Sequence, residues 1–194
     1  MAAGQALPLS QQQLAISGHS IEARIYAEDP QNEFLPTAGK VSWLSQPQSS
    51  ANVRVDSAVV ANDEVGVFYD PMIAKLIVWG EDRATAIQRL QQALGEYRIA
   101  GLTTNINFLS RLSGHGAYRN AELSTDFIER FADDLLAVDH EEVQRHGLLV
   151  CLYEALNARQ VRSSCPWHGH DTWRMNPEHL QTTAWLIGGV EQHI

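Results

Sequence analysis

The chain has 194 residues, 44% of them hydrophobic, which is enough for one large domain or for one domain plus part of another. Its formal net charge of −9 and its pI near 5.3 argue against nucleic-acid and anionic-membrane partners, because both need clustered lysines and arginines. No apolar run reaches the ~20 residues that cross a bilayer, and the first residues lack the basic start and apolar core of a signal peptide.

The two cysteines, Cys151 and Cys165, are widely spaced, and neither has a CxxC companion. They predict neither a zinc site nor a disulfide framework, so a reduced compartment, the cytoplasm, is the expected location. Residues 1–4 resemble the tail of a helix that ends in a glycine cap. We therefore expect the chain to begin in the middle of a longer protein.

The stretch Gly18–Pro30 alternates small apolar residues with charged or polar ones, which predicts a strand with one apolar and one polar face. The polar face carries Glu22, Arg24, Tyr26 and Glu28. Taken alone, this stretch is most simply a solvated strand with a Glu22–Arg24 pair. The alternative is one wall of a ligand cleft.

Short strand candidates follow at residues 40–44, 52–56 and 65–68, after a loop that two prolines interrupt. In the second of these strands, Arg54 and Asp56 fall on the same side. Because short polar turns join the segments, an antiparallel arrangement is the simplest expectation.

Residues 70–80 form the most apolar strand of the chain, with Asp70 at its start and Lys75 in its middle. A lysine in such a run must pair its ammonium group or extend its stem to water. Two interpretations remain open. Either this is an edge strand whose Lys75 points at solvent, or Asp70 and Lys75 lie at the rim of a polar cleft.

From residue 81 the apolar spacing changes to that of helices. Asp82 is expected to cap the first helix, whose apolar face holds Ile87, Leu90, Leu94 and Tyr97. Thr104 or Asn105 is expected to cap a second helix, and Ser124 or Thr125 a third, with a loop at residues 113–116 between them.

A second unit is expected from Val138, with a long helix from Glu141 to Gln160. Its leucines are expected to face inward: Leu148, Leu149, Leu152 and Leu156. The irregular segment that follows contains His168 and His170, which without a third ligand favour a loop over a metal site. Residues 182–187 predict a single strand, so we expect this unit to be truncated.

The sequence contains no GxGxxG, no P-loop, no HExxH and no nucleophile elbow. It therefore predicts no complete catalytic constellation by itself. Its distinctive chemistry lies in Glu22, Arg24, Asp70 and Lys75.

Several segments, in order along the chain, resemble the C-terminal domain of biotin carboxylase: residues 18–30, 34–36, 53–56, 68–76 and 101–107. The resemblance covers residues 1–136 and implies an α+β fold, an antiparallel sheet of about five to eight strands with about two to three packed helices. Residues 146–194 resemble the region that follows this domain in biotin-containing subunits of acyl-CoA carboxylases, most of all that of 3-methylcrotonyl-CoA carboxylase. We expect residues 137–194 to begin the inter-subunit contact region between the biotin carboxylase and carrier domains.

This resemblance implies an ATP-dependent carbon–carbon ligase of leucine degradation that carboxylates biotin with ATP and bicarbonate. Its cofactors would be biotin on a carrier domain outside this chain, and ATP and Mg held mainly by an upstream ATP-grasp region. A carboxyltransferase subunit would then pass the carboxyl group to 3-methylcrotonyl-CoA. Because the groups that hold ATP and Mg lie mainly upstream, the isolated chain is expected to be inactive. Geranyl-, propionyl- and acetyl-CoA carboxylases remain alternatives, as does a non-catalytic interaction domain with the same fold.

The resemblance also implies roles for single residues. Arg24 would face the biotin ureido oxygen and bicarbonate, where a permanently charged guanidinium suits a developing oxyanion. Asp70 would orient Arg24 or line the biotin pocket, with Lys75 close behind. Thr125 would lie near the adenine of ATP, and Arg54 at the subunit interface of the dimeric bacterial enzyme. No metal ligand is expected, and an uncovered apolar face on the long helix would favour self-association.

Overall fold

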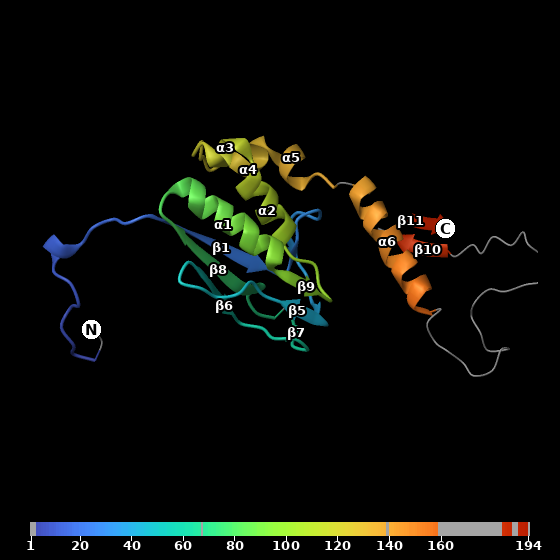
Figure 1. Ribbon diagram of the computed structural model, residues 1–194, viewed down its shortest axis with the longest axis horizontal. Helices are drawn as coiled ribbons and strands as arrows, with labels where there is room; N and C mark the ends of the chain where they lie inside the picture. Colours follow the sequence, from blue (N-terminus) through green and yellow to red (C-terminus); the bar gives the residue numbers. More distant parts are fainter. Residues whose placement is uncertain (1–2, 67, 139, 159–183, 188–189, 194) are drawn as a thin grey trace, which may run out of the picture. The chain divides into compact units, whose positions relative to one another are not determined.

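The computed structural model describes residues 3–66, 68–138, 140–158, 184–187 and 190–193 (Figure 1). It divides into two compact units, Met1–Ala137 and Val138–Ile194. Within the described residues, no helix is long and apolar enough to cross a membrane.

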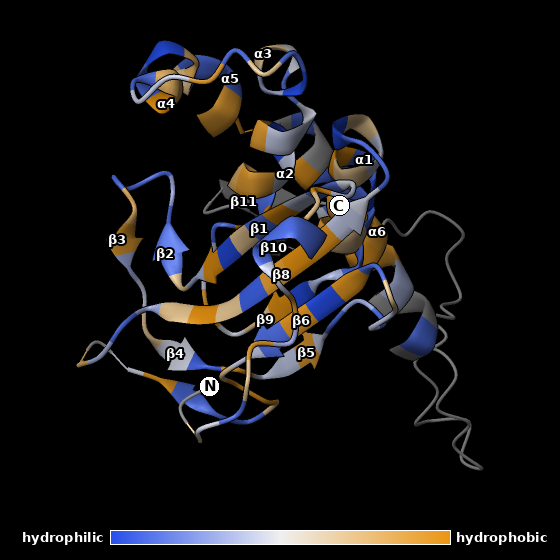
Figure 2. Ribbon diagram, turned by 90° about the vertical axis from the view of Figure 1, so that its left-hand side faces the viewer, coloured by the Kyte–Doolittle hydropathy of each residue, from blue (hydrophilic) through white to orange (hydrophobic). Residues whose placement is uncertain are grey.

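A three-stranded antiparallel sheet forms the centre of the first unit, in the order β1 (His19–Tyr26), β8 (Met72–Gly80) and β6 (Val53–Ser57). Figure 2 shows hydrophobic and hydrophilic residues alternating along these strands. Ile21 and Ile25 are buried on one face, as the sequence pattern predicts. Of the two interpretations of residues 70–80, that of an edge strand is wrong, because β8 pairs with a strand on each side.

The other strands form two-stranded antiparallel ladders: β2 (Glu28–Asp29) with β3 (Leu35–Pro36), β4 (Gly39–Lys40) with β7 (Glu64–Val65), and β5 (Trp43–Ser45) with β9 (Arg98–Ala100). The predicted α+β antiparallel class is confirmed, but the strands do not form one continuous sheet.

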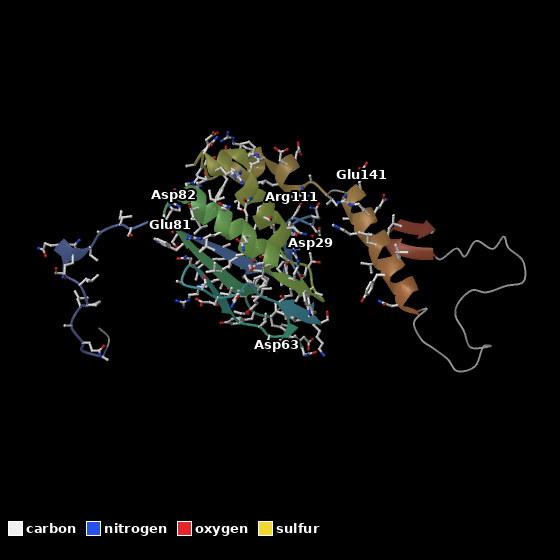
Figure 3. The ribbon with its side chains drawn as sticks, in the orientation of Figure 1. Asp29, Asp63, Glu81, Asp82, Arg111 and Glu141 are labelled. Carbon is white, nitrogen blue, oxygen red and sulfur yellow. The ribbon has the colours of Figure 1, made fainter. Side chains whose placement is uncertain are left out.

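Two helices cover the apolar face of the central sheet. Helix α1 (Arg83–Glu96) begins where the sequence predicts, because the Asp82 carboxylate accepts the N–H of Thr85 at 2.8 Å. Figure 3 places Asp82 at this end of α1. Helix α2 (Ile106–Gly114) begins after Asn105 and contacts α1. A short 3-10 helix, Gln11–Gln13, precedes the sheet.

Three short helices follow: α3 (Gly116–Arg119), α4 (Phe127–Arg130) and α5 (Ala132–Leu136). The loop expected at residues 113–116 is only a junction, because α2 runs to Gly114 and α3 starts two residues later. The side chain of His115 accepts the N–H of Ala117 at 3.3 Å and so caps α3.

The second unit contains α6 (His140–Ala158), β10 (Ala184–Ile187) and β11 (Val190–His193). The predicted long helix is confirmed, and the expected single strand is one arm of an antiparallel pair. Leucines of α6 that were expected to face inward are instead exposed, at 42%, 57% and 56%: Leu148, Leu149 and Leu152. His168 and His170 lie outside the described residues.

Candidate functional site

On the face of the central sheet opposite its apolar core, six side chains from two adjacent rows form what we call the outer face: Glu22, Arg24, Arg54, Asp56, Lys75 and Ile77. The strand register sets them in two rows across β1, β8 and β6. One row reads Arg24, Lys75, Asp56, and the other reads Glu22, Ile77, Arg54. Three strands that are spread over residues 19–80 of the sequence therefore contribute side chains to one charged surface.

Arg24 lies on β1 with 56% of its side chain exposed. Its Nε donates to Oε1 of Glu22 at 3.0 Å, because residues two apart in a strand share a face. Hydrogen bonding to Glu22 and, to a lesser degree, to Tyr26 raises the pKa of Arg24 above its ordinary value. The guanidinium is therefore charged at every physiological pH.

Lys75 is half-buried on β8, directly opposite Arg24 on one side and Asp56 on the other. The Asp56 carboxylate accepts from Nε of Arg54 at 2.7 Å. Within the described part of the chain, Lys75 forms no ion pair within 4.0 Å. Two cations thus occupy opposed positions of the ladder, and both neighbouring carboxylates are bonded to arginines, an arrangement that suits an anionic ligand.

Asp70 lies in the turn before β8, where its Oδ1 accepts the N–H of Met72 at 2.8 Å. It is exposed, and its charge acts on Glu28, whose pKa is raised first by burial and second by Asp70. The carboxylate bonded to Arg24 is Glu22. The structure therefore brings Asp70 to Glu28, just beyond the end of β1.

Arg54 lies on the outer face with 72% of its side chain exposed. Thr125 is also exposed, but it precedes α4 among the helices on the α1 side of the sheet (Figure 1). The structure therefore gathers Arg24, Lys75 and Arg54 on one surface and does not bring Thr125 to it.

A hollow of about 270 Å³ lies between β1 and the helices α1, α2 and α3. Most of its lining is apolar: Ile21, Ala23, Leu90, Leu109, Leu112 and Tyr118. Because β1 is an edge strand, its unpaired backbone edge is available to other groups here.

Asn105 also lines this hollow, and its side chain bonds to β1 on both sides of Ile25. Its Nδ2 donates to the carbonyl of Arg24 at 3.1 Å, and its Oδ1 accepts the N–H of Tyr26 at 3.0 Å. The sequence pattern predicts Asn105 only as a candidate helix cap. Its partners lie 81 and 79 positions away, so no local pattern signals the contact.

Comparison with known proteins gives consistent findings. The family model for the biotin carboxylase C-terminal domain matches residues 22–130. The chain is 42% identical over 171 residues to the mitochondrial alpha subunit of methylcrotonoyl-CoA carboxylase from Rattus norvegicus, covering 88% of this chain and 24% of that protein. It is 43% identical over 129 residues to the biotin carboxylase of a Nostoc species, covering 66% of this chain and 29% of that protein.

A solved structure is also similar: the biotin carboxylase domain dimer of Hydrogenobacter thermophilus 2-oxoglutarate carboxylase, in complex with MgADP, ADP and bicarbonate. It is 33% identical with a TM-score of 0.68, and the match covers 71% of this chain and 30% of that one. The chain thus spans less than a third of the length of the curated relatives it matches.

Proposed function

Because the chain belongs to the biotin carboxylase C-terminal domain family, we propose that it supplies one wall of the biotin and bicarbonate site of an ATP-dependent carbon–carbon ligase. The proposed parent reaction uses ATP and bicarbonate to carboxylate a ureido nitrogen of biotin. One observation carries the proposal for this surface: Arg24 and Lys75 occupy opposed positions of the ladder, and no carboxylate of the described residues forms an ion pair with Lys75.

The chemistry of that pair fits the proposed step. When the ureido nitrogen loses its proton, negative charge spreads to the ureido oxygen. A guanidinium held in place by Glu22 stabilises that charge, and the neighbouring Lys75 ammonium adds a second cation. The pair also suits bicarbonate, whose planar oxygens match the fork of an arginine.

ATP and magnesium are proposed to bind mainly to an upstream ATP-grasp region of the same polypeptide. Among the described residues, no group of three or more His, Cys, Asp or Glu side chains could hold a metal ion. The sequence also lacks a glycine-rich phosphate loop.

The other predicted site residues keep narrower roles. We place Asp70 at the edge of the biotin pocket, because Glu22 already holds Arg24. Arg54 is proposed at a subunit interface, a role supported by its exposure on the outer face. The proposal that Thr125 lies near the adenine of ATP rests on the sequence resemblance.

Substrate and partners are also proposals. A carrier domain would present biotin, and a carboxyltransferase subunit would pass the carboxyl group to 3-methylcrotonyl-CoA, the acceptor suggested by the name of the rat relative. Geranyl-, propionyl- and acetyl-CoA carboxylases are alternatives. The proposed location is the cytoplasm, and self-association through the exposed leucines of α6 is proposed for the separate chain.

Replacing Arg24 tests the main proposal. In the complete carboxylase, Arg24→Ala should lower biotin carboxylation by about 100-fold or more, because the developing oxyanion loses its nearest cation. The KM for ATP should stay within about twofold of its original value, since Arg24 is assigned to biotin and bicarbonate. The control is Arg98→Ala, which removes an exposed arginine of β9. Unchanged biotin carboxylation in the Arg24 variant would refute the proposed role.

A further inference from the structure

The ladder between β1 and β8 is irregular next to Arg24. Pairing between β1 and β8 is regular from His19 to Ile25, and the register then shifts between Ile25 and Tyr26. The extra residue is Ile73 of β8, which has no partner in β1, so the ladder is disrupted beside Ile25 and Tyr26. The peptide groups around Ile25 therefore need support from elsewhere if Arg24 is to keep one orientation.

Asn105 provides that support from the unpaired edge of β1. Besides its two side-chain bonds to Arg24 and Tyr26, its own N–H donates to the carbonyl of Tyr26 at 3.2 Å. These three hydrogen bonds take the place of a neighbouring strand over two residues. Asn105 is only 6% exposed, so water has little access to replace them.

The position of Asn105 makes this use of its side chain unusual. It precedes α2 as the N-cap, where an asparagine side chain commonly accepts an N–H from the first helical turn. Here its side chain makes no such cap hydrogen bond and is directed to β1 instead. The first turn of α2 therefore lacks a side-chain cap hydrogen bond, because the Asn105 side chain bonds to β1, the strand that carries Arg24.

We propose that Asn105 is a positioning residue for Arg24. Its amide fixes the Arg24 carbonyl and the Tyr26 N–H together, and so fixes the direction in which the Arg24 side chain leaves β1. This inference rests on the proposed biotin carboxylase function. Only an amide meets both needs at this length, because an aspartate would accept the Tyr26 N–H but set an oxygen against the Arg24 carbonyl.

The test is Asn105→Asp in the complete carboxylase, with Asn107→Asp as its control. Asn107 lies two residues further along the chain and is exposed on α2, so the control makes the same chemical change away from β1. The kcat for biotin carboxylation should fall by about tenfold or more in the Asn105 variant, since small misplacements of a catalytic group are costly. The KM for ATP should stay within about twofold in both variants.

Hydrogen exchange of peptides that span β1 measures the contact between Asn105 and β1 independently of activity. Exchange at the Tyr26 amide should be faster by about tenfold or more in Asn105→Asp and unchanged in Asn107→Asp. Asn105→Gln keeps both amide groups on a longer side chain, so its carboxylation rate should lie between those of Asn105→Asp and the unsubstituted protein.

The outcomes separate the two proposals. If the unsubstituted carboxylase does not carboxylate biotin, the proposed function fails. If it does, and Asn105→Asp carboxylates biotin within about twofold of its rate, the positioning role alone fails. A rise in the KM for ATP that matches the loss of kcat would also overturn the positioning role, because it would indicate general misfolding.

Discussion

Arg24 and Lys75 occupy directly opposed positions on the outer face of the β1–β8 ladder. Like charges in this arrangement destabilise a sheet. The carboxylates nearest in register, Glu22 and Asp56, are each bonded to an arginine of their own strand. The arrangement is therefore costly to the free protein, and an anion placed between the two cations would relieve it.

Lys75→Gln tests this cost directly. Removing the ammonium should leave the free energy of unfolding unchanged or raise it by about 0.2–1 kcal/mol, because a repulsive pair is lost. The same change should raise the KM for bicarbonate by about tenfold, the usual scale for losing one charged hydrogen bond. Urea denaturation and steady-state kinetics measure the two effects.

The control for this substitution is Lys40→Gln, which removes the only other lysine of the chain, an exposed residue of β4. It should leave the KM for bicarbonate unchanged. A Lys75 variant that loses stability and keeps its bicarbonate KM would mean that Lys75 is structural, which would remove it from the proposed site.

Glu22→Gln should reduce biotin carboxylation less than Arg24→Ala does. Arg24 remains in place and charged in this variant, but it loses the carboxylate bonded to its Nε at 3.0 Å. A loss of about three- to tenfold in kcat is expected, with the KM for ATP unchanged. If Glu22→Gln proved as damaging as Arg24→Ala, Glu22 would act directly in the reaction and not merely as a support.

Much of the fold follows from local sequence patterns. The alternation around Arg24 predicts a strand with Ile21 and Ile25 inward, and the structure buries both. Asp82 predicts the start of α1, because a cap depends only on residues within one turn. These features are set by neighbours in sequence, so periodicity and capping rules are enough to find them.

The composition of the outer face does not follow from such patterns. Lys75 stands opposite Arg24 only because β8 pairs with β1 in one particular register, and a shift of one residue would turn Lys75 into the core. The contact between Asn105 and β1 joins residues about 80 positions apart, and nothing in the sequence near Asn105 signals it. Tertiary pairing therefore decides the composition of this surface, and only the proposed role of Arg24 comes from the sequence resemblance.

The cap of α1 should make stability depend on pH. Hydrogen bonds from the backbone and side chain of Thr85 lower the pKa of Asp82 below its ordinary value of 3.8. The folded state thus favours the charged form, so its contribution is present above pH 3.8 and is lost as the pH falls through the lower, folded-state pKa. Asp82→Ala should lower Tm at pH 7 and have progressively less effect in acid.

Asp82→Asn separates the charge from the cap, because asparagine is a comparable N-cap without a charge to titrate. This variant should keep most of the Tm at pH 7 and should lack the acid-dependent loss. Thermal unfolding at several pH values measures both variants. A pH profile for Asp82→Ala that runs parallel to that of the unsubstituted chain would show that the cap carboxylate does not contribute.

Two glycines should respond oppositely to alanine. Gly101 has φ +107°, and a Cβ there would collide with the carbonyl of Lys40, which a fixed backbone cannot avoid. Gly95 lies inside α1 with nothing within 4 Å of an added Cβ. Gly101→Ala should lower the free energy of unfolding by more than about 1 kcal/mol, whereas Gly95→Ala should raise it by about 0.5–1 kcal/mol. Urea denaturation of both variants measures this contrast. If the Gly101→Ala variant were as stable as the Gly95→Ala variant, the positive φ of Gly101, in the loop before Asn105, would be contradicted.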